Sequence, residues 1–299
     1  MPDSYIVARG GSGQRDKAMY GNGDDDQPEG WINRRITRVD TVSPRLIAQF
    51  RATLFSSLAE VEVPLGLFWA LSPDALPPVD LGRDGHPQPG LILPRLPLPR
   101  RMWAGGEVVT SGRFAEGDLV QRDSTVESIT FKTGSTGRLG FVSVRHDYSV
   151  AGIMRVSERQ DLVYRAGPVP GAPLPDYPIA PDLGPPLADL GITPDPVLLF
   201  RYSALTFNGH RIHYDRPYAT GVEGYDDLVV HGPMQATWML NLAARVLGAC
   251  PSAFTYRGVS PLTCGQAIRV EAHAGPDGAL ALRVRRDGGP VTMTGTALA

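Results

Sequence analysis

The stretch PMQATWMLNLAARVL, residues 233–247, decides the fold. Its apolar side chains occupy nearly every side of a helix and leave almost no polar face. A helix that is apolar nearly all round belongs in the interior of a protein and not on its surface. We therefore expect one long, buried helix here. Its apolar residues are Met234, Ala236, Trp238, Met239, Leu240, Leu242, Ala243, Ala244, Val246 and Leu247.

Short β-prone runs flank this helix and are separated by turn-forming residues, so we expect them to be strands. One run, VLLFRYSAL at residues 197–205, precedes the helix. The runs that follow it are SAFTYRGVS (252–260), QAIRVEAHAG (266–275), LALRVRRDG (280–288) and VTMTGTAL (291–298). A buried helix wrapped by an antiparallel sheet is the hotdog arrangement, and the expected fold class is α+β.

The N-terminal half has the same order of elements, a helix and then strands. Residues 43–61 place apolar side chains at helical spacing, with Ser43 as the N-cap and Pro44 at the first helical position. β-prone runs follow at residues 106–114, 118–134, 137–150 and 159–165. This order predicts a double hotdog, in which the N-terminal repeat is a diverged copy, although no internal sequence similarity is visible.

Two segments of unusual composition divide the chain. Residues 166–196 contain ten of its 28 prolines. Because proline lacks the N–H that a sheet requires, we expect this segment to be an extended linker outside any sheet. Residues 1–29 are rich in Gly and Asp and predict a disordered leader. The predicted repeats are therefore residues 30–165 and residues 197–299.

The composition of the whole chain is that of a soluble globular protein. Its net charge of −2 gives no excess of positive charge for binding nucleic acid or an anionic membrane. No apolar run reaches the roughly 18–20 residues that span a bilayer. Two cysteines, Cys250 and Cys264, are too few for a disulfide framework, so we expect reduced thiols and a cytoplasmic protein.

The loop before the buried helix gathers titratable side chains. His210, His213 and His231, three of the six histidines, lie there together with Asn208 and Asp215. Polar residues clustered between two apolar elements are typical of an active site presented on a loop. The alternative is a solvated loop, but such loops rarely hold half of a chain's imidazoles.

These residues resemble the signature of the MaoC-like double-hotdog hydratases and dehydratases, which act on acyl thioesters. That signature has the form S-G-D-x-N-P-(I/L)-H-x-D, followed by H-G at the head of the hotdog helix. Residues 206–215, TFNGHRIHYD, match it without a gap, and residues 231–232 supply the second element. One departure matters: Asn208 occupies the position of the family's catalytic Asp, and His210 that of its Asn.

The resemblance covers the chain from about Trp31 onward. The motifs DGHP (84–87), PRRMWAGG (99–106) and the stretch around Lys132 and Arg145 narrow it to a subgroup. That subgroup includes mesaconyl-CoA and itaconyl-CoA hydratases and type 2 3-hydroxyacyl-thioester dehydratases.

The resemblance implies addition of water across the 2,3-double bond of an enoyl thioester, which needs proton transfer and donors for the enolate oxygen. His213 is the expected proton-transfer residue, because imidazole titrates near neutral pH. Asn208 is expected to orient the water. The N–H of Gly232, at the positive end of the predicted helix, is expected to polarise the thioester carbonyl, as in the family. The alternative for His213 is a core histidine bonded to the backbone.

Substrate-binding residues are also expected around this loop. Arg211 replaces the family's Pro and is a candidate to bind the second carboxylate of a dicarboxylic acyl group; an arginine that braces the loop is an equal alternative. His210 and His231 are expected to line the substrate, and Arg257 to contact the phosphates of coenzyme A. His86 is expected to be structural.

The predicted function is reversible hydration of a 2-enoyl-CoA, favouring a short dicarboxylic acyl group such as mesaconyl or itaconyl. The alternatives are a 3-hydroxyacyl-thioester dehydratase, with an acyl-CoA or acyl carrier protein substrate, and a non-catalytic acyl-CoA-binding module. No cofactor is expected beyond the coenzyme A of the substrate. No metal is expected, because no third ligand accompanies His210 and His213 at plausible spacing. A homodimer is expected.

Overall fold

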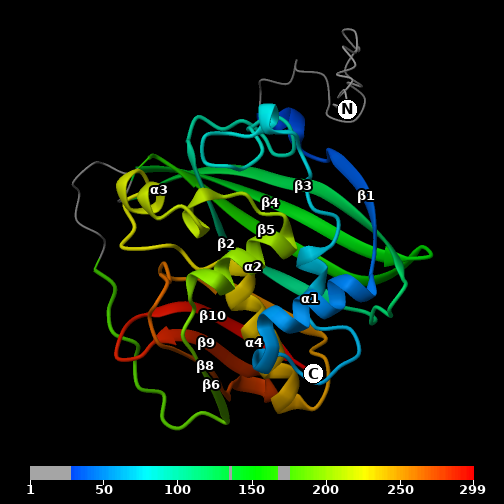
Figure 1. Cartoon of the computed structure of the whole chain (residues 1–299), viewed down its shortest axis with the longest axis vertical. Helices are drawn as coiled ribbons and strands as arrows, with labels where there is room; N and C mark the ends of the chain where they lie inside the picture. Colours follow the sequence, from blue (N-terminus) through cyan, green and yellow to red (C-terminus); the bar gives the residue numbers. More distant parts are fainter. Residues whose placement is uncertain (1–27, 135–136, 168–175) are drawn as a thin grey trace, which may run out of the picture.

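Ten strands form one antiparallel sheet in the computed structural model, which describes residues 28–134, 137–167 and 176–299. Their order across the sheet is β1-β3-β4-β5-β2-β7-β10-β9-β8-β6. The strands are β1 (Arg35–Thr41), β2 (Arg100–Thr110), β3 (Leu119–Gly134), β4 (Gly137–Val150), β5 (Ile153–Arg165), β6 (Ala188–Ile192), β7 (Ala253–Gly258), β8 (Ile268–Ala274), β9 (Leu280–Arg286) and β10 (Val291–Leu298). Figure 1 shows β1–β5 above β6–β10.

The strand order is symmetric about the central pair of strands, β2 and β7. Moving outward, β5, β4, β3 and β1 follow β2, while β10, β9, β8 and β6 follow β7. β2 and β7 pair from Gly105↔Arg257 to Val109↔Ala253. Each half of the chain therefore contributes five strands with the same connectivity, and the second half begins with β6, before the predicted start at residue 197.

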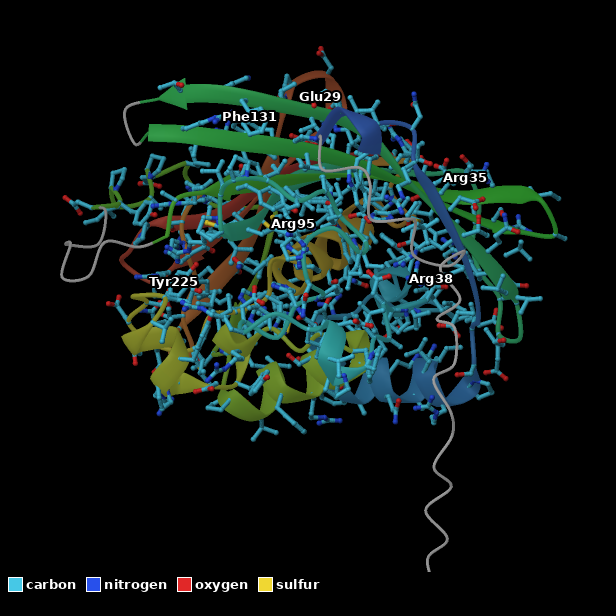
Figure 2. The ribbon with its side chains drawn as sticks, turned by 90° about the horizontal axis from the view of Figure 1, so that it is seen from above. Glu29, Arg35, Arg38, Arg95, Phe131 and Tyr225 are labelled. Carbon is cyan, nitrogen blue, oxygen red and sulfur yellow. The ribbon has the colours of Figure 1, made fainter. Side chains whose placement is uncertain are left out.

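A helix occupies the same place in both halves, directly after the first strand. α1 (Pro44–Leu54) follows β1, and α2 (Pro196–Thr206) follows β6. Each helix begins with a proline behind an N-cap side chain, Ser43 or Asp195. The cap at Ser43 is the one predicted from the sequence. The two helices pack against each other in one layer, visible along the lower edge of Figure 2.

The prediction of a strand at residues 197–205 is wrong, because these residues lie in α2. The Asp195 carboxylate accepts a hydrogen bond from the Leu198 N–H at 2.7 Å, which starts the helix. Leu199, Tyr202 and Ser203 then become buried at helical spacing. The β-propensity of this run is outweighed by the cap and by tertiary packing, as is common for a context-dependent preference.

The buried helix predicted at residues 233–247 is confirmed as α4 (Gly232–Leu247), in which residues 234–244 are all buried. It contacts β6 to β10, and it lies between the strands and the layer of α1 and α2 (Figure 2). The N-terminal half has no counterpart, because residues 55–99 form only the short 3-10 turns η2 (Phe55–Ser57), η3 (Leu67–Ala70) and η4 (Pro78–Asp80). Within the part of the chain that the structure describes, only the C-terminal strands wrap a long helix.

Residues 188–192 contradict the prediction that the proline-rich segment 166–196 stays outside the sheet. They form β6, which pairs with β8 from Ala188↔Ala272 to Ile192↔Ile268 at one edge of the sheet. This stretch, ADLGI, lies between the prolines and contains none, so its N–H groups are available. The opposite edge strand, β1, was also not predicted.

The expected leader, residues 1–29, lies outside the described residues except for its last two. The described part begins with η1 (Pro28–Trp31), in which Trp31 is buried. None of the described helices is both long and apolar enough to cross a bilayer. Cys250 and Cys264 are free thiols, as expected.

Candidate active site

His213 lies between α2 and α3 (Arg216–Gly221), at the end of the 3-10 turn η5 (Arg211–His213). Its imidazole is buried, and Nδ1 lies 2.7 Å from the backbone oxygen of Val229. Because a carbonyl oxygen only accepts hydrogen bonds, Nδ1 carries the hydrogen and Nε2 keeps its lone pair. Within the described residues Nε2 has no hydrogen-bond partner. The ring is therefore held in the tautomer that a general base needs.

His231 and Gly232 stand at the head of α4, directly beside His213. The rings of His231 and His213 stack with centroids 3.6 Å apart. Nε2 of His231 lies 2.9 Å from Oγ of Ser203, and the residue is only 1% exposed. The His231 ring therefore packs against one face of the His213 ring and holds it in place. Gly232 opens α4, where the first N–H groups have no partner within the helix and the helix dipole is positive.

The absence of a side chain at Gly232 makes room for Trp103 of β2. A Cβ atom on Gly232 would lie 2.3 Å from Cε3 of the indole. The same indole stacks on Tyr256 of β7, with ring centroids 4.4 Å apart. Both halves of the chain therefore pack around the head of α4.

A buried carboxyl group, Glu158 of β5, lies beyond these rings. Its Oε1 accepts hydrogen bonds from Nε1 of Trp69 at 2.8 Å and from the hydroxyl of Tyr256 at 2.5 Å. Burial raises the pKa of Glu158, so its neutral form is favoured. Among the described residues, Oε2 of Glu158 and Nε1 of Trp103 have no partner. Both atoms are inaccessible to solvent, so Glu158 belongs to a buried polar cluster that joins the two halves of the chain.

Asn208 caps the turn that carries the histidines. Its Oδ1 accepts a hydrogen bond from the His210 N–H at 2.9 Å, and its own N–H donates to the Ser203 oxygen at 2.9 Å. The side chain thus fixes the loop and is not free to move. One lone pair of Oδ1 and the Nδ2 hydrogens remain for a water molecule.

A loop of the N-terminal half brings Asp84 and His86 to the same place. The backbone N–H of Arg211 donates a hydrogen bond to the backbone oxygen of Asp84 at 2.8 Å. The ring centroids of His86 and His210 lie 3.9 Å apart. Nδ1 of His86 lies 3.1 Å from Oδ2 of Asp84, whose Oδ1 accepts from the His86 N–H at 3.1 Å. Sequence reasoning missed this pair. The motif DGHP is part of the family resemblance, but a local motif does not show that Asp84 and His86 lie beside the loop of residues 206–215.

Burial lowers the pKa of every histidine in this cluster. It lowers the pKa of both His213 and His86 to about 4, and it lowers the pKa values of His210 and His231 as well. Burial would raise the pKa of Asp84, but its hydrogen bond and charge interaction with His86 lower it below its ordinary value. Near neutral pH the imidazoles are therefore uncharged.

Asp84, His86 and His210 also offer ligand atoms within 4.8 Å of one another. The premise that His210 lacks further candidate ligands is therefore wrong, because spacing along the chain does not show contacts between the two halves. Both carboxylate oxygens of Asp84, however, already accept hydrogen bonds from His86. That arrangement fits an acid–base pair better than a set of metal ligands.

Arg211 has partners within its own loop. Its Nε and Nη2 donate to Oδ2 of Asp215 at 2.9 and 2.7 Å, and Nη1 donates to the Arg83 oxygen at 3.1 Å. The guanidinium also lies 4.1 Å from the centre of the Tyr218 ring. These contacts favour the alternative in which Arg211 braces the loop.

Two other arginines lie on opposite sides of the sheet. Arg257 is exposed and follows Tyr256 on β7. Because successive side chains of a strand alternate, Arg257 points away from the side on which Tyr256 meets Trp103, so the structure does not bring it to the site. Arg101 lies two residues before Trp103 on β2 and therefore on the inner side, opposite Tyr164 in register. It has no ion-pair partner among the described residues, and its charge lowers the pKa values of His86 and His210.

The fold is that of a double-hotdog protein, and buried histidines gather at the head of its central helix. The chain belongs to the hydroxyacyl-thioester dehydratase type 2 family, whose model matches residues 67–264. It is 40% identical over 258 residues to mesaconyl-C(4)-CoA hydratase of Chloroflexus aurantiacus, an alignment that covers 77% of this chain and 89% of that protein.

Solved structures share the fold at low sequence identity. HtdX of Mycobacterium tuberculosis superposes with a TM-score of 0.63 at 20% identity, covering 89% of this chain and all of that one (100%). A double-hotdog protein of the same organism has a TM-score of 0.53 at 16% identity, covering 89% and 96%. The predicted family and the predicted double-hotdog fold are both confirmed.

Proposed function

We propose that this protein is a hydro-lyase that adds water reversibly to a 2-enoyl thioester. The observation that carries the proposal is the free Nε2 of His213, beside the head of α4. The backbone oxygen of Val229 fixes the tautomer of that ring, and the stacked ring of His231 fixes its plane. A base and a helix N-terminus at one place are what this chemistry requires.

In the hydration direction the thioester oxygen would accept a hydrogen bond from the N–H of Gly232. The positive end of α4 then stabilises the negative charge that develops on this oxygen as water adds to the β-carbon. His213 accepts a hydrogen bond from the water through Nε2, and Asn208 orients it. The loop is held rigid by the Asn208 cap and by the contacts of Arg211, which limits the cost of positioning the water.

The substrate that we favour is a short dicarboxylic acyl-CoA. The relative from Chloroflexus aurantiacus is named for mesaconyl-C(4)-CoA, and it is similar over most of its length. Since Arg211 is engaged by Asp215, Arg101 is the better candidate for the second carboxylate. The second candidate function is dehydration of a 3-hydroxyacyl thioester, which the family's description favours.

A panel of enoyl-CoA substrates tests the proposal. Mesaconyl-, itaconyl-, crotonyl- and a long-chain enoyl-CoA are compared by the loss of absorbance of the conjugated thioester. We expect turnover of at least one, fastest for a dicarboxylic acyl group, and a loss of roughly 10²-fold or more in His213→Gln. Faster turnover of crotonyl-CoA or of the long-chain substrate would favour the dehydratase function. No turnover of any enoyl-CoA would contradict the hydro-lyase assignment.

We further propose that the protein is a cytoplasmic homodimer. Val197 and Phe200 on α2, together with nearby Phe207, are each more than half exposed, and such apolar residues favour association. The free thiols of Cys250 and Cys264 are compatible with a reducing compartment. Light scattering coupled to size-exclusion chromatography tests the dimer, and a monomer at micromolar concentration would contradict it.

A further inference from the structure

We propose that Asp84 and His86, from the N-terminal half, form a second acid–base pair that supplies the proton acceptor missing at Asn208. The family signature has a carboxylate at that position, and an amide cannot take up a proton. The inference rests on the proposed hydro-lyase function, and it assigns a role to residues that lie outside the catalytic loop.

The hydrogen bonds of this pair are those of an oriented base. Both oxygens of Asp84 accept hydrogen bonds from His86, one from its backbone N–H and one from Nδ1, each at 3.1 Å. The Asp84 carboxylate is an acceptor only, so Nδ1 carries the hydrogen and the lone pair lies on Nε2. Within the described residues Nε2 has no partner. His86 also keeps a side-chain exposure of 20%, so part of the side chain is open to solvent.

The position of the pair also supports the proposal. The ring of His86 lies 3.9 Å from that of His210, which in turn lies 5.5 Å from that of His213, measured between centroids. A hydrogen bond from the backbone N–H of Arg211 to the backbone oxygen of Asp84 joins the two loops. The ring of His210 thus lies close to both His86 and His213, which come from opposite halves of the chain.

The chemical step balances without any further reactant. A water molecule held by Nε2 of His213 gives one proton to Nε2 of His86, and its oxygen forms a bond to the β-carbon. The π electrons of the double bond move through the α-carbon to the thioester oxygen. The enolate then collapses, and the α-carbon takes the proton back from the His86 imidazolium. Asp84 stabilises that imidazolium while it exists, because a carboxylate favours the charged form of an adjacent imidazole.

The alternative is that His86 only bridges the two loops. Chemical rescue separates the two roles, because a small base added in solution can replace a proton acceptor but cannot replace a bridge. The matched control is His273 of β8, a histidine that also lies close to a carboxylate. It follows Ala272, an inward-facing core residue, so it lies on the other side of the sheet, where Nε2 is 3.4 Å from Glu271.

The experiment uses the full-length protein and the fastest enoyl-CoA of the panel. We expect His86→Ala to lower kcat by roughly 10²-fold, with KM changed little, and Asp84→Asn to lower kcat by a smaller factor. Added imidazole should restore part of the His86→Ala activity, and substituted imidazoles should restore more as their basicity rises. His273→Ala should retain wild-type kcat and show no response to imidazole.

Three results would overturn the inference while leaving the hydro-lyase function intact. The first is a His86→Ala variant within about threefold of wild type, far less than removal of an acid–base group costs. The second is a loss of activity that imidazole does not restore and that accompanies a lower melting temperature. The third is wild-type activity that is abolished by a chelator and restored by Zn²⁺, which would make Asp84, His86 and His210 a metal site. A wild-type protein that hydrates no enoyl-CoA would contradict the proposed function, and this inference with it.

Discussion

The loops that carry Gly85 and Gly209 meet backbone to backbone, at a distance that only glycine permits. A Cβ atom on Gly85 would lie 1.9 Å from the carbonyl oxygen of Gly209, and Gly85 has a φ of +86°. Asp84 and His86 flank Gly85 in the chain, and Asn208 and His210 flank Gly209. This contact therefore sets the distance between the two groups of polar side chains that form the candidate site.

Substitution of Gly85 should consequently separate the two halves of the site. In Gly85→Ala the methyl group would force the loops apart, and we expect kcat to fall by roughly 10²-fold, since small misplacements of reacting groups are costly. Gly90→Ala is the matched control. Gly90 has a similar φ of +92°, but its Cβ would meet only the side chain of Arg95, at 3.8 Å. Both variants should lose some stability through backbone strain, and only Gly85→Ala should lose activity in the hydration assay.

Replacing Asn208 by the aspartate of the family signature provides a second test of which residue accepts the proton. Asn208→Asp should keep its fold, because an aspartate can cap the same turn by accepting from the His210 N–H. If Asp84 and His86 supply the missing proton acceptor, Asn208→Asp should raise the low activity of His86→Ala when the two changes are combined. The measurement is a double-mutant cycle on kcat. Purely additive effects would mean that the two positions do not share a role, and a collapse in Asn208→Asp alone would mean that the neutral amide is required.

The central helix and the clustering of polar residues in the loop before it could be predicted from the sequence, because each is encoded locally. The all-round apolar pattern of residues 233–247 allows only a buried helix, and the spacing of Asn208, His213 and Gly232 lies within one short stretch. The strand predicted over 197–205 was wrong, because the cap at Asp195 and packing against α1 outweigh β-propensity there. Asp84 and His86 were missed for a different reason. They reach the loop through a contact between residues more than a hundred positions apart, and nothing in the local pattern encodes that contact.

Two arginines are candidates to bind the second carboxylate of the proposed dicarboxylic substrate. Arg211 is held by Asp215 and by the Arg83 oxygen, whereas Arg101 lies on the inner side of β2 without an ion-pair partner among the described residues. We expect Arg101→Met to lower kcat/KM for mesaconyl-CoA by roughly tenfold or more and to leave crotonyl-CoA unchanged, because only the former would lose a charge-assisted hydrogen bond.

Arg211→Met should lower turnover of both substrates alike and reduce the melting temperature, and Asp215→Asn should reproduce its effects. A selective loss of mesaconyl-CoA turnover in Arg211→Met would instead restore Arg211 as the carboxylate-binding residue. That outcome would require its contact with Asp215 to open when substrate binds.

The stability of the fold should depend on pH through Glu271, on the side of β8 opposite the active site. Burial would raise the pKa of this carboxyl, but hydrogen bonds from Arg285 and Arg283 outweigh burial and lower its pKa to about 2. A carboxyl whose pKa is lowered by folding stabilises the protein above its unfolded pKa of about 4.5, and this contribution is lost as the pH falls toward 2. At pH 7 the contribution is roughly 3 kcal/mol by linkage.

Urea unfolding of the wild type and of Glu271→Gln at pH 7, 5 and 3 isolates this contribution. The buried histidines have lowered pKa values, so both proteins should lose stability together as the pH falls from about 6.5 to about 4. The difference between them, in contrast, should stay constant down to about pH 5 and shrink only at pH 3. Glu107→Gln is the control, because the ion pair of Glu107 with Arg159 is about one-third exposed on both sides and should be worth at most about 1 kcal/mol. A difference between wild type and Glu271→Gln that is equally large at pH 3 and pH 7 would show that packing, and not the charge of Glu271, stabilises this side of the sheet.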